Sequence, residues 1–453
     1  MILSLGTLSF AQPASPPSHH VSITISPAAS AVPALRYRLL PPLGQQTPGN
    51  AATQYLIAFE LLPQSATPDD IDDLLGVPLK DLDTTKTRAA LREYASALAQ
   101  VRIAADRQQC QWDLPLRQEG INTLLPYLAR VRQVARALAL QSREQIADRR
   151  FDDAGQTLRT GFAMVHHLQN EGVLVQGLVE AGIADLLLAR VSELQQASGS
   201  PNLYWALANL PKPLIDTQTI AQAEQAWIDF SFPELRGRPV EQLTDDELRG
   251  LFRHMKEFQS RSGQLPPGDA QNLAFAGLMA GVYGSAREYL IAHGRTEEQV
   301  RQMPVEAVLA PYVFNQAQRW SDESFKWAGL PYWQSRAGIE HAQQENTAQA
   351  QQANNPLATL LPAIDVAFLH FAQTERMIAR LQLIEALRAY ASTHDGQFPP
   401  TLDALSPDMP APIDPITGKN FGYEAHGKSA TLTIEGITSP KTVPQLVIEI
   451  KSS

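Results

Sequence analysis

The sequence has a single cysteine, Cys110, among its 453 residues. Because a disulfide bond needs two cysteines, none can form within the chain. A lone thiol can also act as a nucleophile, but no histidine or aspartate lies at motif spacing from Cys110. We therefore predict a small buried side chain there. The cysteine count excludes a disulfide-stabilised scaffold and fits either an oxidising or a reducing compartment.

Long apolar runs and concentrated basic charge are also missing. The best membrane candidate, residues 357–372, contains Pro362, Asp365 and His370 and is shorter than the about 20 residues that span a bilayer. We predict a buried helix there and no transmembrane span in the mature chain. The formal net charge is −10, and the basic residues, mostly arginine, are spread along predicted helices. This pattern argues against a nucleic-acid partner, which needs a concentrated basic surface.

The common catalytic and cofactor-binding motifs are absent as well. The sequence contains no H-E-x-x-H, G-x-S-x-G, G-x-G-x-x-G, C-x-x-C or phosphate-binding glycine loop. His166 and His167 are adjacent, and neighbouring helical residues point about 100° apart. We therefore expect one packed and one exposed histidine rather than a metal site. No catalytic, cofactor-binding or metal-binding residue is predicted, and no cofactor is expected.

The N-terminus is typical of a short export signal. Residues 1–11 are apolar and place the small residues Ser9 and Ala11 at the −3 and −1 positions that signal peptidase prefers. A Pro/Ser-rich linker follows at 12–20, but no basic residue precedes Arg36. We predict a signal-peptide remnant at 1–11 and an exported protein of the periplasm or cell envelope. If residues 1–11 are not a signal, the chain is cytoplasmic.

Two short segments near the N-terminus have the alternating pattern of strands. Residues 21–26 and 34–40 alternate apolar and polar side chains, and we expect them to pair across the intervening loop. A compact helix is then predicted at 67–76, with Thr67 as N-cap and Gly76 at its end. Its four aspartates fit the positive end of a helix dipole better than a calcium loop.

From about residue 88 to 210 the apolar spacing is helical. Residues 146–169 resemble the second half of a tetratricopeptide repeat, with a polar turn at Arg149 and Arg150 and small Ala154 where paired helices approach. Only one such unit is visible, whereas a solenoid needs at least three. The pattern therefore predicts a TPR-like helix pair rather than an array.

The C-terminal part has a different organisation. An apolar stripe predicts a helix that ends at Thr393, followed by Gly396 in the left-handed conformation and by Pro399, which fixes the exit direction. Asp414 precedes Pro415, and such an aspartate accepts hydrogen bonds from backbone N–H groups two residues on. Beyond it, residues 429–436 and 445–450 have the pattern of strands, while Thr401 is expected to cap a short helix between these parts.

This order resembles the C-terminal portion of type II secretion pseudopilins, in which a long helix, a G-x-[FLY]-P-x-x-L turn and a D-P-x-x-G-x-x-[FY]-x-Y loop precede a small antiparallel sheet. The likeness covers about residues 372–436. It is carried by Gly396, Phe398, Pro399, Leu402, Asp414, Pro415, Gly418, Phe421 and Tyr423. The pseudopilin membrane helix has no counterpart here, so the resemblance does not imply pilus assembly. The Asp-rich calcium loop of the major pseudopilin has no evident counterpart either.

The chain also resembles, nearly end to end, a group of uncharacterised exported proteins of planctomycete bacteria. The segments "LRYRLLPP", "FDDAGQTLRTG", "GSPNLYWALANLP" and "DPITGKNFGYE" carry this likeness. It implies a fold and a compartment but no activity.

The densest group of aromatic residues is the best candidate for a partner-binding surface. Residues 319–334 include Trp320, Trp327, Tyr332 and Trp333, and aromatic residues are enriched at interfaces. Packing of the same residues in the core is the favoured interpretation, and the binding surface is the alternative.

Together these features predict a mainly α protein, with helical bundle or TPR-like hairpins, short N-terminal strands and a small C-terminal α+β module. The expected segments are 1–11 signal remnant, 12–20 linker, 21–66 strand pair, 67–216 TPR-like region, 217–340 second helical region, 341–356 Gln/Asn-rich linker and 357–453 pseudopilin-like module. The preferred function is a non-enzymatic exported scaffold that binds a protein or peptide of the cell envelope. The alternatives are an envelope hydrolase with dispersed carboxylates and histidines, and an accessory of a secretion or pilus-like system.

Overall fold

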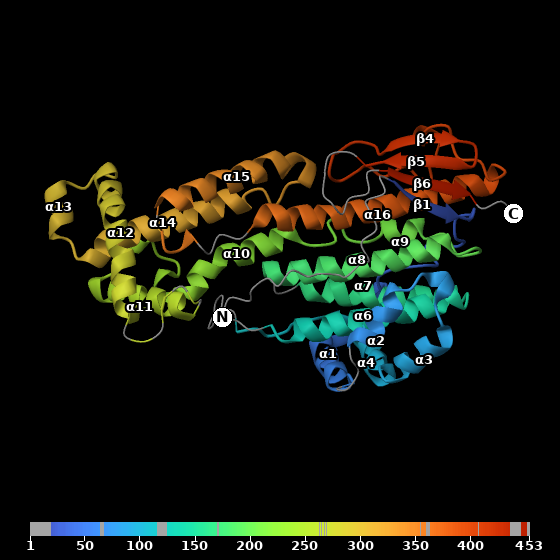
Figure 1. The fold of residues 1–453 in the computed structure, drawn as a ribbon, viewed down its shortest axis with the longest axis horizontal. Helices are drawn as coiled ribbons and strands as arrows, with labels where there is room; N and C mark the ends of the chain where they lie inside the picture. Colours follow the sequence, from blue (N-terminus) through green and yellow to red (C-terminus); the bar gives the residue numbers. More distant parts are fainter. Residues whose placement is uncertain are drawn as a thin grey trace.

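The computed structural model describes residues 20–63, 68–115, 125–169, 172–261, 263, 265–266, 268, 270–353, 355–358, 363–405, 407–434 and 445–450. The predicted leader at 1–11, the linker up to residue 19 and Thr67 lie outside these ranges. The fold is mainly helical with a small C-terminal sheet (Figure 1), which confirms the predicted class. None of the described helices has the length and apolar character of a membrane-crossing segment.

The N-terminal lobe is a layered helical bundle. Its helices are α1 (Ala51–Glu60), α2 (Pro68–Gly76), α3 (Thr84–Arg92), α4 (Ala95–Ala105), α6 (Tyr127–Ala147), α7 (Phe151–Leu168), α8 (Leu174–Gln196) and α9 (Tyr204–Ala208). The predicted helix at 67–76 is α2, which begins at Pro68 and ends at Gly76. A short parallel pair, β2 (Thr47–Asn50) and β3 (Arg107–Gln109), lies beside α1.

Helices α6 and α7 form the predicted hairpin. The chain reverses at Arg149, whose φ of 61° places it in the left-handed region. Ala154, Leu158 and Phe162 recur on one face of α7 and are fully buried, as the helical period requires. Gly161 lets α8 come close, because a Cβ there would lie 2.7 Å from a methyl carbon of Leu187.

A second lobe extends from the bundle and has its own core. It comprises α10 (Thr217–Ser231), α11 (Asp245–Arg261), α12 (Ala270–Ala292), α13 (Glu297–Gln302), α14 (Val305–Phe325) and α15 (Tyr332–Ala353). Helix α10 contributes Ala221 to the first core and Ile228 to the second. The lobes therefore share a continuous helix.

The segment 341–356, predicted as a linker, is instead mostly helical in α15. Alanine and glutamine have good helix propensity, and the segment packs on α14 through buried Ala342 and Asn346. The Asn346 amide donates to the Trp320 carbonyl at 3.0 Å and to Ser324 Oγ at 2.9 Å. Low sequence complexity concealed this packed face.

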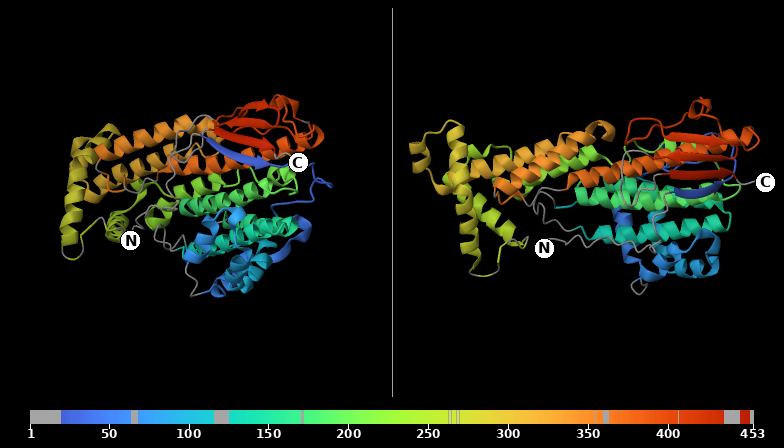
Figure 2. Two further views of the ribbon diagram at one scale, coloured as in Figure 1. Left: turned by 45° about the vertical axis from the view of Figure 1, so that its right-hand side comes forward. Right: turned by 45° about the horizontal axis from the view of Figure 1, so that its top comes forward.

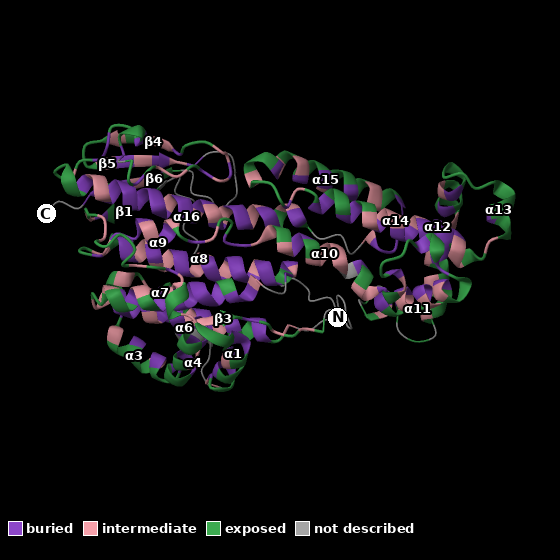
Figure 3. Cartoon of the chain, turned by 180° about the vertical axis from the view of Figure 1, so that it is seen from behind, coloured by how far each residue is buried: buried purple, intermediate pink, exposed green. Residues whose placement is uncertain are grey.

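The C-terminal module is a four-stranded sheet on a long helix, α16 (Ile364–Thr393). Strands β4 (Gly422–His426), β5 (Ser429–Thr433) and β6 (Gln445–Ile450) are antiparallel, and the strand order is β1-β6-β5-β4. Leu383 and Leu387 of α16 pack against Leu432 and Ile448 of the sheet. Figure 3 shows α16 buried along most of its length.

The predicted N-terminal strand pair is half wrong. Residues His20–Ile25 form β1, which pairs in parallel with β6 over six residues, so the start of the chain completes the C-terminal sheet (Figure 2). Residues 34–40 form no strand and instead lie against α7, where Tyr37 Oη donates to Asp152 at 2.8 Å. Strand pairing follows the partner that buries Ile25 rather than the nearest segment in sequence.

The predicted end of α16 is confirmed. The helix ends at Thr393, Gly396 has a φ of 72°, and its N–H donates to the Ala391 carbonyl at 3.0 Å. Asp395 is also left-handed, with a φ of 52°. Thr401 precedes a short 3-10 helix (Leu402–Ala404), but its side chain makes no capping hydrogen bond there among the described residues.

Candidate interaction surface

The predicted aromatic surface is divided between core and exterior. Trp320 is 1% exposed and its indole donates to Gln349 at 3.1 Å, which favours the core interpretation for this residue. Trp327 is partly buried, with Gly338 against its ring and the Lys326 ammonium 5.2 Å from the ring centre. Tyr332 is partly buried, and desolvation raises its pKa to about 12.

Trp333 lies at the surface, next to the C-terminal loop. It is 44% exposed, and Leu330, just before it, is 47% exposed. Gly418 lies directly against the indole, since a Cβ at this glycine would be 2.6 Å from Trp333 Cδ2. We call Leu330, Tyr332, Trp333 and Gly418 the corner surface, because they join the start of α15 to the loop at 414–421.

The backbone under the corner surface is held firmly. The Leu330 N–H donates to the Trp327 carbonyl at 3.1 Å, and the Ser335 N–H and hydroxyl both reach the Pro331 carbonyl. The exposed apolar side chains therefore sit on an ordered turn.

Asp414 holds the loop behind the corner surface. Its Oδ1 accepts the Ile416 N–H at 2.9 Å, which confirms the predicted turn two residues on. The Arg376 guanidinium of α16 also donates two hydrogen bonds to the Asp414 carboxylate, from Nε to Oδ1 at 2.8 Å and from Nη2 to Oδ2 at 2.7 Å. Both side chains are nearly fully buried, and the two-pronged geometry fixes the loop on the helix.

A second buried ion pair lies further along α16. Arg388 and Glu385 have fully buried side chains and are joined at 2.8 Å. Arg388 also donates to the Ser26, Ser200 and Pro201 carbonyls. The pair therefore fixes the exit of β1 to the α8–α9 connection.

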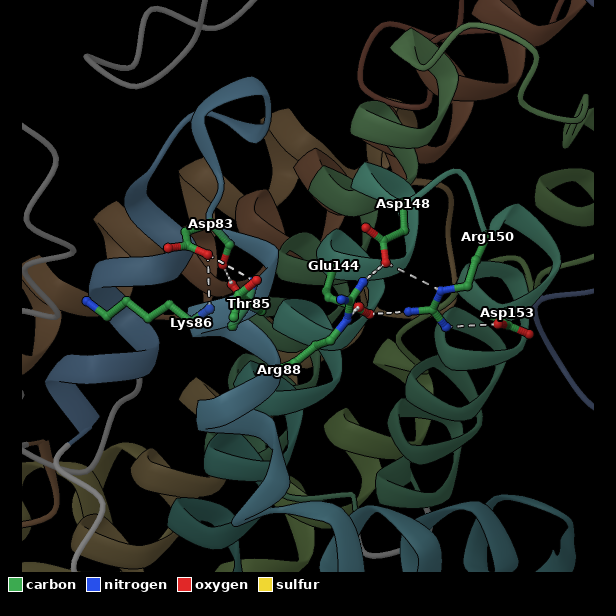
Figure 4. Close-up of polar contacts among 9 residues, drawn as sticks. Asp83, Thr85, Lys86, Arg88, Glu144, Asp148, Arg150 and Asp153 are labelled. Atoms are coloured by element: carbon green, nitrogen blue, oxygen red, sulfur yellow. Dashed lines mark hydrogen bonds and ion pairs between the residues drawn. The ribbon is translucent and has the colours of Figure 1, made fainter.

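A surface ion-pair network joins α3 to the α6–α7 turn (Figure 4). Arg88 contacts Glu144 at 2.5 Å and also Asp148, while Arg150 contacts Glu144 and, at 3.0 Å, Asp153. Glu144 is buried between the two arginines. Every one of these charges has an opposite charge within the fold, so the network supports architecture.

Several carboxyl groups lie between α8, α10 and α16. Desolvation raises the pKa of Glu375 to about 7 and raises the pKa values of Glu180 and Glu224. Glu224 accepts the Leu174 N–H at 2.7 Å, and Glu375 accepts the Leu214 N–H. Glu224 thus links α10 to the start of α8, and Glu375 links α16 to the segment before α10.

The partly exposed His370 is hydrogen-bonded to Asp185 at 3.0 Å. The Asp185 carboxylate also accepts the Thr374 hydroxyl at 2.8 Å. An Asp–His pair of this kind is the group most relevant to the hydrolase alternative, since an oriented imidazole can act as a general base. Its aspartate, however, also links α8 to α16 through Thr374.

Cys110 is buried, as predicted, and of the two adjacent histidines His167 is packed and His166 exposed, also as predicted. His167 Nε2 lies 3.1 Å from the Arg107 carbonyl, which can only accept, so this nitrogen carries the hydrogen. Nδ1 then accepts from Tyr55 Oη at 2.9 Å. Burial lowers the pKa of His167 to about 4, so the ring is neutral and both nitrogens are occupied.

Within the described ranges, no three His, Cys, Asp or Glu side chains gather as a metal site.

A second exposed apolar face lies on the packed pair α1 and α4. Leu56, Ile57, Leu61 and Ile103 are each 42–54% exposed there. Sequence reasoning missed this face, because α1 has the apolar content of a core helix.

No known family model, curated protein or solved structure compared with the chain is significantly similar to it.

Proposed function

We propose that this protein is a non-enzymatic, exported helical scaffold of the cell envelope that binds a protein or peptide partner through the corner surface. The observation that carries the proposal is Trp333, which remains 44% exposed on an ordered turn against Gly418. Large aromatic side chains on rigid backbones are the usual anchors of protein interfaces.

The use of the buried charges supports a scaffold. The ion pair Arg376–Asp414 joins α16 to the loop. The ion pair Arg388–Glu385 joins α16 to the exit of β1 and to the α8–α9 connection. The Figure 4 network does the same at the α6–α7 turn. Such groups specify the geometry of a surface rather than carry out chemistry.

The proposed relation to secretion systems rests on the C-terminal module. The long helix α16, the turn at Gly396 and Pro399, the Asp414-Pro415 loop and the antiparallel strands β4, β5 and β6 follow one another along the chain. This is the order on which the resemblance to pseudopilins rests. An accessory role in a secretion or pilus-like system is therefore the second candidate, and it uses the same corner surface.

The binding claim is tested by affinity capture from the native envelope fraction with tagged wild-type protein and two variants. Trp333→Glu places a charge in the corner surface, and Leu273→Glu places one at a 79% exposed position on α12. We expect a reproducible protein to be retained by wild type and Leu273→Glu and lost with Trp333→Glu. Equal capture by all three would contradict the proposal.

The export claim is tested separately by N-terminal sequencing of the protein recovered from its native cells. A mature chain that begins at or near Gln12 in the envelope fraction supports it. A retained Met1 in the cytosol would exclude it.

A further inference from the structure

A polar recess of about 860 Å³ opens on the N-terminal lobe, beside the β2–β3 pair. Its lining includes Asn50, Gln108, Gln109, Gln111 and Asp113. None of these residues belongs to the corner surface, so the recess is a separate feature.

Asn50 fixes the geometry of one wall. Its Oδ1 accepts the N–H groups of Ala52 at 3.0 Å and Gln111 at 2.9 Å, and its Nδ2 donates to the Gln111 carbonyl at 2.8 Å. The Asn50 side-chain amide thus caps α1 and holds the segment that follows β3. The segment 108–111 is therefore ordered before any ligand arrives, which lowers the entropy cost of binding.

Three glutamine amides on this segment are available to a ligand. The side chains of Gln108, Gln109 and Gln111 form no hydrogen bond with another described residue, and all three residues are exposed. Each amide presents both a donor and an acceptor, the same pair that a peptide group presents. Gln109 and Gln111 both line the recess and lie two residues apart, the spacing that brings side chains to one side of an extended segment. Their amides therefore match the donors and acceptors that an extended peptide presents along one edge.

The charge of the recess is negative. Asp113 is the one charged side chain among its described lining residues. The neighbouring Arg107 is directed elsewhere, with Nη1 at 2.5 Å from the Pro48 carbonyl. An opposite charge on the ligand is therefore favoured near Asp113.

We propose that this recess binds an extended peptide segment that carries lysine or arginine, with the glutamine amides pairing to its backbone and Asp113 to its basic side chain. A glycan fits less well, because sugars pack on open aromatic faces. Trp112, the nearest candidate ring, is instead stacked on Tyr127 at 4.3 Å and on Tyr55 at 5.8 Å.

The test is fluorescence anisotropy of the full chain with two labelled decapeptides, one alternating threonine with lysine and one alternating threonine with glutamate. The triple variant Gln108→Ala/Gln109→Ala/Gln111→Ala removes the amides. Asp113→Asn removes the charge and keeps the backbone, since Asp113 has a φ of 53° and asparagine tolerates the left-handed region. The matched control is Gln344→Ala/Gln351→Ala/Gln352→Ala, on exposed positions of α15.

We expect wild type and the control to bind the lysine peptide equally and more tightly than the glutamate peptide. The triple variant should weaken binding about tenfold, and Asp113→Asn should abolish the preference for lysine. Lack of binding by either peptide up to about 1 mM, or unchanged binding by the triple variant, would overturn the proposal. Calorimetric binding of chitotetraose without peptide binding would overturn it in favour of a glycan site.

Discussion

At the residue scale, Arg388 shows how much of this fold depends on one buried charge. Its guanidinium is fully buried and reaches Glu385, Ser26, Ser200 and Pro201. The sequence offers no sign of this role, because an arginine one turn after a glutamate on a helix usually means an exposed pair. Only the approach of β1 and the α8–α9 connection removes it from water.

Arg388→Ala should lower the free energy of unfolding by about 3–5 kcal/mol, because it leaves the buried Glu385 carboxyl without its opposite charge. Urea titration followed by circular dichroism measures the loss. The double variant Arg388→Met/Glu385→Leu should recover only part of it, because the Ser26, Ser200 and Pro201 carbonyls still lose their donor. Arg319→Ala, at an exposed arginine, should change stability by less than about 0.5 kcal/mol; an equal effect of the two alanine variants would refute the role of the pair.

Glu375 gives the protein a pH-dependent stability. Its pKa in the folded chain is about 7, above the ordinary 4.5, because burial disfavours the charged form. The folded state therefore holds the proton longer than the unfolded state, and the free energy of unfolding falls as pH rises from about 5 to 8. Glu375→Gln should reduce this fall by at most about 3 kcal/mol in urea titrations across that range. Gln351→Ala, at an exposed position of α15, removes no titratable group and should leave the slope unchanged.

Of the two contacts that Asp414 makes, one could be predicted from the sequence and the other could not. The Asp414 turn follows from local chemistry, since aspartate before proline accepts nearby backbone N–H groups. Its second partner, Arg376, lies 38 residues away on α16. That contact depends on how the loop folds back, so no local pattern could predict it.

At the element scale, the corner surface depends on a glycine. Gly418 is left-handed, with a φ of 68°, and it contacts the Trp333 ring. The sequence motif identified Gly418 and the aromatic cluster identified Trp333, but their contact joins α15 to a loop about 85 residues later. Helix ends and turns were predictable here because they use local chemistry, whereas the docking of elements was not.

Gly418→Ala should cost about 1–2 kcal/mol of stability and displace Trp333, with a red shift of tryptophan fluorescence. Gly237→Ala is the matched control, because Gly237 has a similar φ of 66° but open space around it. It should show the backbone strain without the fluorescence shift. Identical spectra for the two variants would argue against the Trp333–Gly418 contact.

The two errors at this scale have a common origin. Residues 341–356 lack an obvious apolar stripe, which suggested a linker instead of a helix. Residues 34–40 alternate apolar and polar side chains, which suggested a strand where none forms. In α15 a few alanine and asparagine contacts suffice, because α14 provides the packing surface. Residues 34–40 pack on α7 instead, where Tyr37 donates to Asp152.

At the scale of the whole molecule, two strands that are more than 400 residues apart in the sequence, His20–Ile25 and Gln445–Ile450, meet in one sheet. Strand β1 pairs with β6, and Ile25 is fully buried beneath them. The helical lobes lie between these strands in sequence. The C-terminal module therefore cannot be separated cleanly from the rest of the chain, which the sequence alone did not indicate.

Ile25→Ala should destabilise the sheet by about 2–4 kcal/mol and speed amide hydrogen exchange in β6 as well as β1. Val21→Ala, at a 39% exposed position of the same strand, serves as control and should have little effect. Faster exchange confined to β1 would show that the sheet does not depend on the N-terminal strand.

The central claim is that the corner surface binds a protein partner in the cell envelope. The most direct measurement replaces Trp333 with a photo-crosslinking amino acid, irradiates native cells and identifies adducts by mass spectrometry. In the control, the same photo-crosslinking amino acid replaces Leu43, which is 81% exposed on the N-terminal lobe. We predict that position 333 forms a reproducible adduct with one protein and that position 43 forms no adduct with that protein. An absence of adducts at position 333, or the same adducts from both positions, would contradict the account.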